Sequence, residues 1–536
     1  MKKTNGQKGI TLVALVITII ILLILATISI QALTNTGLFA KAQEAKEKSQ
    51  NAEENQEKTL NEYEDELNKY ISGNVKTLQA DGSWNSSKKV NSPQLMEGMT
   101  GIYWDESGKE VEVNVDNQDN WYDYSAQKWA NAVTKDSNGN ITGYWVWIPR
   151  YAYKIETNRY TNTVGKISVK FLQGTTNKDE SNAEISTAYP ETTGATMSAY
   201  VVHPSFINGT LNHYMNGEWD KEISGYWVAK YPAGFQANTI TNNNGTLSTT
   251  ISNSSDTVVY SNKNYTSYHA NMTTNALSQN LTSSGYASQK LSYPVFKPLT
   301  YAYNNISTGD AYTISKEIAS ASSFYGLNST KTDSHQMKNS EWGAVAYLTH
   351  SKYGKNGNEI AQNTSYYTGG GYNGRYTSYT SQSSTGNVYG IYDLSGCAYE
   401  YVAAFISKDS YGKFSTYDWT RYTGLKETSA STKYATRYDN NYSSYYTGNF
   451  IVYNCGKIGD ASKEVNTGGH DKTDSRTVYK NWLKDDSNFP YSEYPFFVRG
   501  GNRSDSTYSG LAGVFFTGYA DGHNSDDNSF RAVLCP

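Results

Sequence analysis

Gly390-Ile-Tyr-Asp-Leu-Ser-Gly-Cys-Ala-Tyr-Glu-Tyr-Val402 is the stretch of this chain that says most about its fold. Gly390 and Gly396 suit tight turns or a positive backbone φ angle, which other residues adopt only at a cost. Tyr399 is a candidate core anchor. Glu400 beside Tyr399 and Glu341 beside Trp342 are more typical of structural hydrogen-bond acceptors than of a catalytic carboxylate pair. The stretch therefore predicts tight turns beside a buried aromatic anchor.

Other segments before and after this stretch also carry candidate core anchors and turn residues. Trp342 and Phe530 are further core anchors, and Gly500 and Gly501 are further turn residues. In order, the segments are 225–231, 294–295, 337–348, 390–402, 497–502 and 529–534. Over residues 220–536 this series resembles the formylglycine-generating enzyme, or sulfatase-modifying factor, family. The resemblance implies an α+β C-type-lectin-like domain, in which helices flank a small twisted antiparallel sheet that carries long loops.

The chain departs from that family where the family's oxidase chemistry takes place. In the family, two cysteines shortly after the Gly-Gly element bind copper and substrate. Here residues 502–508 follow Gly501 without a cysteine, and Cys535 lies beyond the Phe530 segment. None of the seven histidines falls in a nucleophile or metal motif. We therefore expect no enzymatic activity, with a diverged oxidase as an alternative.

The candidate ligand-binding residues lie between Arg499 and Phe530. Two polar, turn-forming segments flank the apolar run 511–516, and on a C-type-lectin-like scaffold such loops share one exposed face. The candidates are Asn502, Arg503, Ser504, Asp505, Ser506, Thr507 and Tyr508 in the first segment, and Thr517, Tyr519, Asp521, His523, Asn524, Ser525, Asp526 and Asp527 in the second.

The position of these loops also resembles the variable region of diversity-generating retroelement target proteins, which are receptor-binding proteins with the same fold. The residue types at 502–508 and 519–528 are those that mutagenesis of adenine-containing codons produces. Ordinary polar loops are an equal interpretation, because one sequence shows no variation. Asp521, Asp526 and Asp527 are possible calcium ligands. Their spacing matches no closed calcium loop, so we expect no cofactor.

The N-terminus carries an uncharged run from Ile10 to Leu33, preceded by Lys2, Lys3 and Lys8. As a helix this run is about 35 Å long, enough to cross a hydrocarbon core of about 30 Å. Because positive flanks stay in the cytoplasm, we expect a single-pass helix with the remaining chain outside the cell. A cleaved secretory signal is the alternative, although residues 30–32 make a poor cleavage site.

Lys8-Gly9-Ile10-Thr11-Leu12-Val13 resembles the processing site of type IV prepilins and pseudopilins. The resemblance implies a leader at 1–9, cleavage between Gly9 and Ile10 by a prepilin peptidase, N-methylation of Ile10, and a bacterial cell-surface location. Family members usually carry glutamate at the fifth mature position, where this chain has Ala14. A membrane-held anchor or a minor subunit is therefore favoured over a major filament subunit, with a plain signal anchor as the alternative.

The predicted organisation has four parts: the leader at 1–9, a membrane helix and helical stalk at 10–72, a β-rich part at 73–219, and the lectin-like domain at 220–536. Good helix formers predict the stalk. We expect strands at 99–104 and 110–115, a short amphipathic helix at 121–133, and long surface insertions at 157–198 and 238–283. The similar segments 141–149 and 223–232 are typical of buried strands that end at proline.

The composition limits which classes of binding partner and which kinds of scaffold are expected. The net charge is −4, with 46 basic and 50 acidic residues, so we expect no nucleic-acid binding. The 48 tyrosines and 44 glycines resemble a paratope or, equally, a β-rich domain. Three cysteines, Cys397, Cys455 and Cys535, exclude a disulfide-stapled scaffold. A Cys397–Cys455 bridge and buried free thiols both remain open.

One function hypothesis follows, with two alternatives. The leading hypothesis is a surface-displayed, pilin-like anchored adhesin or receptor-binding protein. Its C-terminal loops would bind a protein or glycan on another cell, phage or host. The second hypothesis is a structural minor pilin that self-assembles with a type IV filament. The third is the diverged oxidase.

Overall fold

The computed structural model describes most of the chain. The described residues are 12–35, 41, 44–52, 55–56, 58–60, 63, 77–157, 165–190, 192–193, 196–209, 219–234, 237–241, 247–248, 257–260, 263–264, 293–304, 306–365, 367–370, 376–406, 425, 433–438, 456–471, 478–491, 494–504, 512–522, 525 and 527–536. They fall into two compact units, Met1–Thr77 and Leu78–Pro536.

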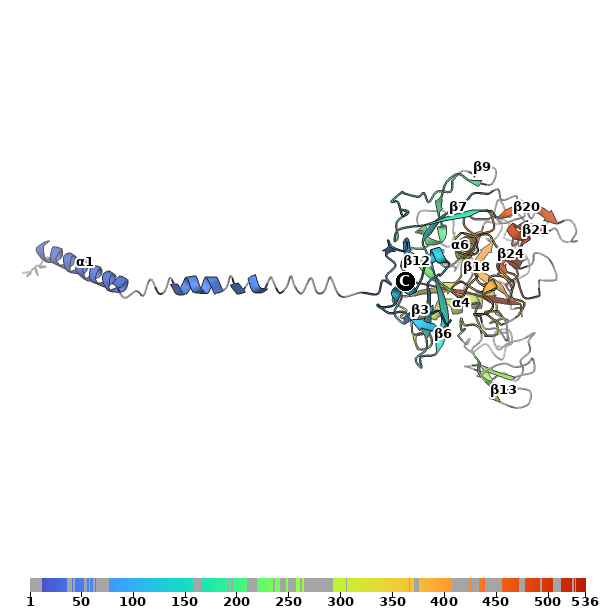
Figure 1. Cartoon of the computed structure of the whole chain (residues 1–536), viewed down its shortest axis with the longest axis horizontal. Coiled ribbons are helices and arrows are strands. Elements are labelled where there is room, and N and C mark those ends of the chain that lie inside the picture. The colour runs from blue at the N-terminus through green and yellow to red at the C-terminus, as the bar shows by residue number, and fades with distance from the viewer. Residues whose placement is uncertain are drawn as a thin grey trace, which may run out of the picture. The chain divides into compact units, whose positions relative to one another are not determined.

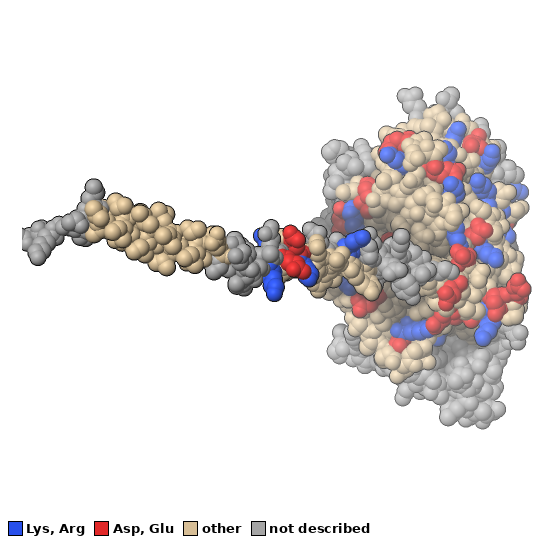
Figure 2. All heavy atoms as spheres, turned by 60° about the vertical axis from the view of Figure 1, so that its left-hand side comes forward, with Lys and Arg blue, Asp and Glu red and all other residues tan. Residues whose placement is uncertain are grey.

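The first unit contains the apolar helix α1 (Leu12–Asn35). Figure 2 shows α1 without charged side chains, and acidic and basic side chains follow it in the described part of the predicted stalk. The Thr18 and Thr27 hydroxyls donate to carbonyls four residues earlier, at 2.7 and 2.6 Å. Their hydrogen bonds are thus satisfied inside the helix, as an apolar environment requires. Val13–Gln31 is long and apolar enough for a membrane anchor or a signal sequence.

The second unit is built around a seven-stranded antiparallel sheet (Figure 1). Its order is β17 (Asp333–Gln336), β26 (Ala532–Cys535), β12 (Gly225–Ala229), β6 (Ile141–Pro149), β5 (Asn131–Lys135), β3 (Met99–Trp104) and β4 (Glu110–Glu112). The strands predicted at 99–104 and 110–115 are confirmed as the β3–β4 hairpin, although β4 ends at Glu112.

The two similar segments pair with each other as β6 and β12. Trp147 lies opposite Trp227, both are fully buried, and their ring centroids are 5.3 Å apart. This pairing crosses the predicted domain boundary at 219/220. That boundary is wrong, because residues 78–536 form one compact unit with shared sheet hydrogen bonds.

A second sheet contains the described strands that follow residue 398, except β26. Its order is β19 (Thr436–Tyr438), β18 (Tyr399–Ile406), β23 (Phe496–Gly500), β24 (Gly513–Ala520), β22 (Asp486–Ser487), β21 (Val478–Asn481) and β20 (Asn466–Asp471), and β25 (Asn528–Phe530) pairs in parallel with β18. The third sheet is β11 (Val201–Val202), β7 (Tyr151–Ile155) and β8 (Ile167–Phe171).

Helix α6 (Asn339–His350) lies between the second and third sheets and is buried along its whole length. The Tyr151 hydroxyl of β7 donates to the Ala344 carbonyl at 2.7 Å, and the Trp342 indole donates to the Val514 carbonyl of β24 at 2.8 Å. The other helices in the described part of this unit are α4 (Thr308–Glu317) and α5 (Ser322–Tyr325). Helices together with mainly antiparallel strands agree with the predicted α+β class.

Two local predictions are wrong. The helix expected at 121–133 is a single 3₁₀ turn, Tyr124–Ala126, followed by β5. The Asp123 carboxylate accepts from the Ser125 and Ala126 amides and closes the turn, and Gln127 leaves it with a φ of 55°. The insertion expected at 157–198 contains the regular strand β8, whose side chains alternate between buried and partly exposed.

The remaining strands are short. They are β1 (Trp84–Asn85) with β2 (Val90–Asn91), β9 (Thr192–Thr193) with β10 (Thr196–Met197), and β13 (Ala237–Thr241) with β14 (Leu247–Ser248), β15 (Thr257–Tyr260) and β16 (Lys263–Asn264).

Candidate binding face

The predicted loops connect β23, β24 and β25, and we call these three strands together with β18 the frame. A buried ion pair between Arg531, which follows β25, and Glu400 of β18 stabilises the frame. Arg531 Nη2 lies 2.6 Å from Glu400 Oε1, and Arg531 Nε lies 2.9 Å from Oε2. Arg531 also donates to the Ala229 and Tyr392 carbonyls, at 2.8 and 2.9 Å. Burial raises the pKa of Glu400, and Arg531 opposes that shift. Glu400 is therefore the structural acceptor that the sequence predicts.

A second buried arginine fixes β23 against β24. Arg499 Nη1 donates to the Thr517 hydroxyl at 2.8 Å, and Nη2 donates to the Ala461 carbonyl at 3.0 Å. Burial lowers the pKa of Arg499 to about 10. Thr517, a predicted ligand-binding residue, is fully buried inside β24. It therefore belongs to the frame, because a ligand at the surface does not reach it.

The first loop leaves β23 through two left-handed glycines, Gly500 and Gly501, with φ of 80° and 73°. Asn502 is only 5% exposed, and its carbonyl accepts from Gln362 Nε2 at 2.8 Å. The Asn502 side-chain oxygen also accepts from the Ser504 amide at 2.7 Å, which closes a tight turn. Asn502 thus shapes the loop, and Ser504 is exposed to solvent.

An ion pair joins the two loops. Arg503 Nη1 lies 2.9 Å from Asp527 Oδ1, and the Arg503 and Asp527 side chains are 17% and 37% exposed. The Asp527 carbonyl accepts from the Tyr399 amide at 2.8 Å, at the start of β18. Ser525 Oγ accepts from the Asp527 amide at 3.3 Å. Since β25 runs parallel to β18, the end of the second loop returns to the Gly500 edge.

Tyr519 and Asp521 lie at the far end of β24 and belong to a different group. The Tyr519 ring packs against Tyr491 and Tyr494, with centroid distances of 5.1 and 5.3 Å. All three tyrosines are partly exposed, as is Asp521. The described candidates therefore divide between an ion-paired edge, at residues 502–504, 525 and 527, and a group near the far end of β24, where Tyr519 packs with Tyr491 and Tyr494.

Other predicted residues lie outside the described part of the chain. They are Gly9, Ile10, Asp505, Ser506, Thr507, Tyr508, His523, Asn524 and Asp526. Among the described residues, no group of three or more His, Cys, Asp or Glu side chains is placed to hold a metal ion.

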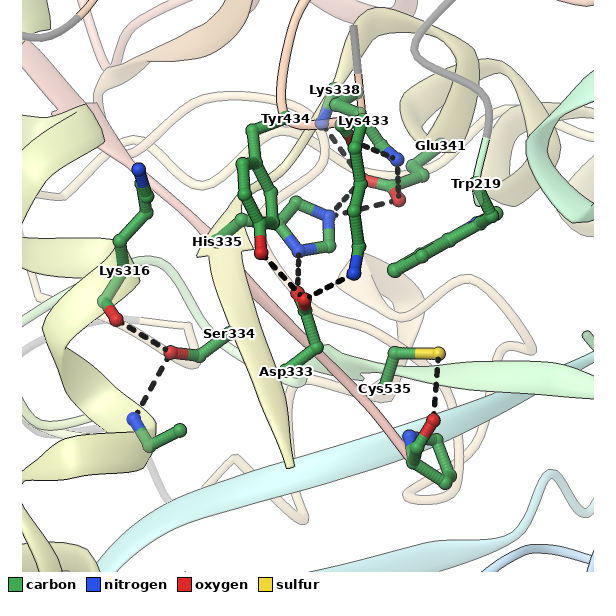
Figure 3. Close-up of polar contacts among 12 residues, drawn as sticks. Trp219, Lys316, Asp333, Ser334, His335, Lys338, Glu341, Lys433, Tyr434 and Cys535 are labelled. Carbon is green, nitrogen blue, oxygen red and sulfur yellow. Dashed lines mark hydrogen bonds and ion pairs between the residues drawn. The ribbon is translucent and has the colours of Figure 1, made fainter. Parts of the chain in front are cut away.

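A buried cluster of charged residues around His335 is the other candidate for a functional site, because such a cluster could in principle support catalysis. Figure 3 shows His335 between two carboxylates, with Nδ1 3.1 Å from Asp333 Oδ1 and Nε2 3.0 Å from Glu341 Oε1. Lys338 Nζ lies 3.1 Å from Glu341 Oε1, and Lys433 Nζ lies 3.0 Å from Asp333 Oδ2. Both imidazole nitrogens are occupied, so His335 has no nitrogen left to act as a base on a substrate.

The protonation states agree with a structural ion-pair network. Burial disfavours the charged form of His335, but Glu341 and Asp333 outweigh burial and raise the His335 pKa. Burial also disfavours the Glu341 carboxylate, yet Lys338 and His335 lower its pKa. The network links β17 to the first turn of α6, where the Lys338 amide donates to Glu341 Oε2 at 2.8 Å. Glu341 is thus a structural acceptor, as predicted.

The described cysteines are also structural. Cys397 and Cys535 are buried free thiols, and burial raises the pKa of each. Cys455 lies outside the described residues.

A groove of about 930 Å³ lies beside β8, and the sequence analysis did not predict it. Its lining includes residues 165–171, Lys89, Tyr200, Lys352 and Tyr353. The alternation Ile167-Ser168-Val169-Lys170-Phe171 is the signal that could have revealed its wall, since alternating apolar and polar residues are typical of a half-buried strand.

No protein-family model matches this chain, and no curated protein matches it significantly.

Proposed function

We propose that this chain is a surface-displayed ligand-binding protein. A pilin-like N-terminal anchor holds a C-type-lectin-like domain, which binds a protein or glycan on another cell, phage or host. The contacts come from the loops that contain residues 502–508 and 519–527. The observation that carries the proposal is the Arg503–Asp527 ion pair, because it joins the first loop to the end of the second loop.

Rigidity beneath the loops supports a binding role. The Arg531–Glu400 pair and the Arg499–Thr517 bond are buried, so the strands from which the loops leave are fixed independently of the loop sequence. A scaffold of this kind lets loops change without refolding. Little conformational entropy is then lost on binding, which favours affinity.

The chemistry of the exposed groups suits recognition. Arg503 offers a planar set of donors, Asp527 offers acceptors, and the cluster of Tyr491, Tyr494 and Tyr519 offers broad amphipathic surface. Arginine and tyrosine are enriched among the residues that dominate binding energy at interfaces. Acidic and basic side chains are interspersed on the face that Figure 2 shows, which favours a specific ligand over a bulk polyanion.

The experiment is a screen of glycan and protein arrays with the full chain in lipid nanodiscs. We expect saturable binding of at least one ligand. The double variant Arg503→Ser/Asp527→Ser should bind this ligand about tenfold more weakly than wild type, because the variant removes the ion pair that joins the two loops. The matched control, Glu106→Ser/Lys109→Ser, removes the same two charges from the exposed β3–β4 turn and should bind like wild type. A ligand that binds both variants equally would contradict the proposal.

A further inference from the structure

Strand β8 has one edge without a neighbouring strand in the described part of the chain. The third sheet is ordered β11-β7-β8, so β8 pairs with β7 on one side only. Directly after β8, Leu172 forms an isolated bridge with Asp179 and the Gln173 amide donates to the Lys178 carbonyl at 2.8 Å, so the open edge ends at Phe171. On the other side lies the groove of about 930 Å³, a size typical of ligand sites. Residues 165–171 form one wall, and Lys352, Tyr353, Asn356 and Asn358 contribute to the rest. An open strand edge of this kind is a template for another strand.

The ladder register shows which backbone groups face the groove. The Glu156 amide donates to the Lys166 carbonyl at 2.9 Å, and the Leu172 amide donates to the Arg150 carbonyl at 3.1 Å. Bonded and non-bonded pairs alternate along an antiparallel ladder, so residues 166, 168, 170 and 172 bond to β7. The residues between them point their N–H and C=O groups away from β7, and these are Ile167, Val169 and Phe171.

The charges around the groove favour an acidic occupant. Lys170 already pairs with Asp179 at 2.7 Å, and Lys166 pairs with Glu156 at 2.8 Å through a side chain that is 73% exposed. Asp179 also accepts from the backbone amides of its own turn. Lys89 and Lys352 line the groove and form no ion pair with any described residue. The acidic Glu180 also lines the groove without such a pair, so the unpaired lining charges are two positive and one negative. Positive charge therefore remains available to a ligand.

We propose that the β8 edge binds an extended acidic segment of a partner protein, which joins the third sheet as a fourth strand. In an antiparallel arrangement, residues directly opposite one another share a face. Acidic side chains at positions i and i+4 of the segment then lie opposite Lys170 and Lys166. Apolar side chains at i+1 and i+3 lie opposite Val169 and Ile167. Main-chain hydrogen bonds supply affinity, and the charges set the register.

A second copy of the chain is a poorer occupant of this edge. Pairing β8 with itself would bring Lys166 and Lys170 of both copies to one seam, where like charges destabilise cross-strand pairs. Edge lysines commonly prevent such self-association. The same two side chains attract a strand that carries carboxylates.

The first test uses a fluorescein-labelled probe, Glu-Val-Ser-Val-Glu, and the full chain in nanodiscs, with binding measured by fluorescence polarisation. We expect binding that the charge-reversed peptide Lys-Val-Ser-Val-Lys lacks. N-methylation of the first valine should weaken binding about tenfold, since that amide faces β8. N-methylation of the serine should leave binding unchanged, because that amide points away. Equal effects of the two methyl groups would overturn strand addition.

The second test changes β8 itself. Val169→Pro removes an amide that faces the groove and keeps every bond to β7, a substitution that edge strands tolerate. Both Val169→Pro and the matched variant Val169→Ala replace a buried side chain, so both should lower Tm to a similar extent. We expect Val169→Ala to bind the probe like wild type and Val169→Pro to bind it about tenfold more weakly. If Val169→Pro fails to fold, the peptide series on the wild-type chain still decides.

An anionic polysaccharide is the competing outcome, tested with heparin in the same assay. Heparin binding that is lost in Lys170→Gln but unchanged in Val169→Pro, together with no binding of the peptide, would assign the groove to an anionic glycan and overturn the proposal. The β8 groove and the C-terminal loops have separate variants, so either proposal can fail without the other.

Discussion

The charged residues discussed above fall into two groups: buried pairs that stabilise the fold and a partly exposed pair at the edge of the candidate loops. Arg531, Glu400 and His335 are buried in ion pairs, whereas Arg503 and Asp527 meet at a partly exposed edge. Truncating one member of a buried pair costs more than removing an exposed one, because it leaves an uncompensated charge without solvent.

His335 gives a pH-dependent test at this scale. Its folded pKa is raised, so its stabilising effect is complete below the unfolded pKa of about 6.5 and is lost as the pH rises through the folded value. We expect His335→Gln to lower the free energy of unfolding by about 3 kcal/mol at pH 5.5. The loss should be smaller at pH 8.5, as measured by urea denaturation.

His350 is the matched control, with the opposite trend. It is buried, neither ring nitrogen has a described hydrogen-bond partner, and burial lowers its pKa to about 3. The folded state then excludes a proton that the unfolded state takes up below a pH of about 6.5. The cost of His350→Gln should therefore shrink toward pH 5.5. The same pH trend in both variants would contradict the assigned protonation states.

At the scale of elements, the sequence predicted strands and helices best where the pattern was strong and local. The apolar run of α1, the β3–β4 hairpin and the paired strands β6 and β12 were all visible. Strand β8 was missed because its five alternating residues lie among Thr, Asn and Ser residues typical of loops. The helix predicted at 121–133 failed because Asp123 closes a turn there, and Trp121 and Trp129 are buried by tertiary contacts rather than by a helical stripe.

The N-terminal element has its own prediction. If the leader is processed as in prepilins, intact-mass analysis of the protein from its native host should show a chain that begins at N-methylated Ile10. Gly9→Val should leave the leader attached, because the peptidase cuts after glycine in that family. Gly6→Val, a control within the same leader, should be cut normally. An N-terminus after residue 32 would instead indicate a secretory signal.

At the scale of the whole molecule, residues 78–536 behave as one unit. The sequence resemblance began near residue 220 and suggested a boundary there, but sequence similarity does not show which edge of a strand is covered. β12 lies between β6 and β26, so residues 220–536, which the sequence predicted as a separate domain, take a sheet neighbour from the part before them. The candidate loops were predicted from their polar, turn-forming residues and from the family resemblance, whereas the Arg503–Asp527 contact required the chain path through β25.

A truncation tests this dependence. The fragment 220–536 loses β6, which exposes Trp227 and one edge of β12, so we expect it to aggregate or to lack a cooperative thermal transition. The fragment 78–536 retains the whole sheet and should unfold cooperatively, as followed by near-ultraviolet circular dichroism. Cooperative unfolding of the shorter fragment would restore the boundary at 219/220.

The central claim, that the C-terminal loops bind the ligand on a frame that stays fixed, is tested most directly by hydrogen–deuterium exchange. The full chain would be measured with and without the strongest ligand from the array screen. The account predicts slower exchange at 502–508 and 519–527, with β18, β23 and β24 unchanged. Protection elsewhere, with these loops unaffected, would contradict it.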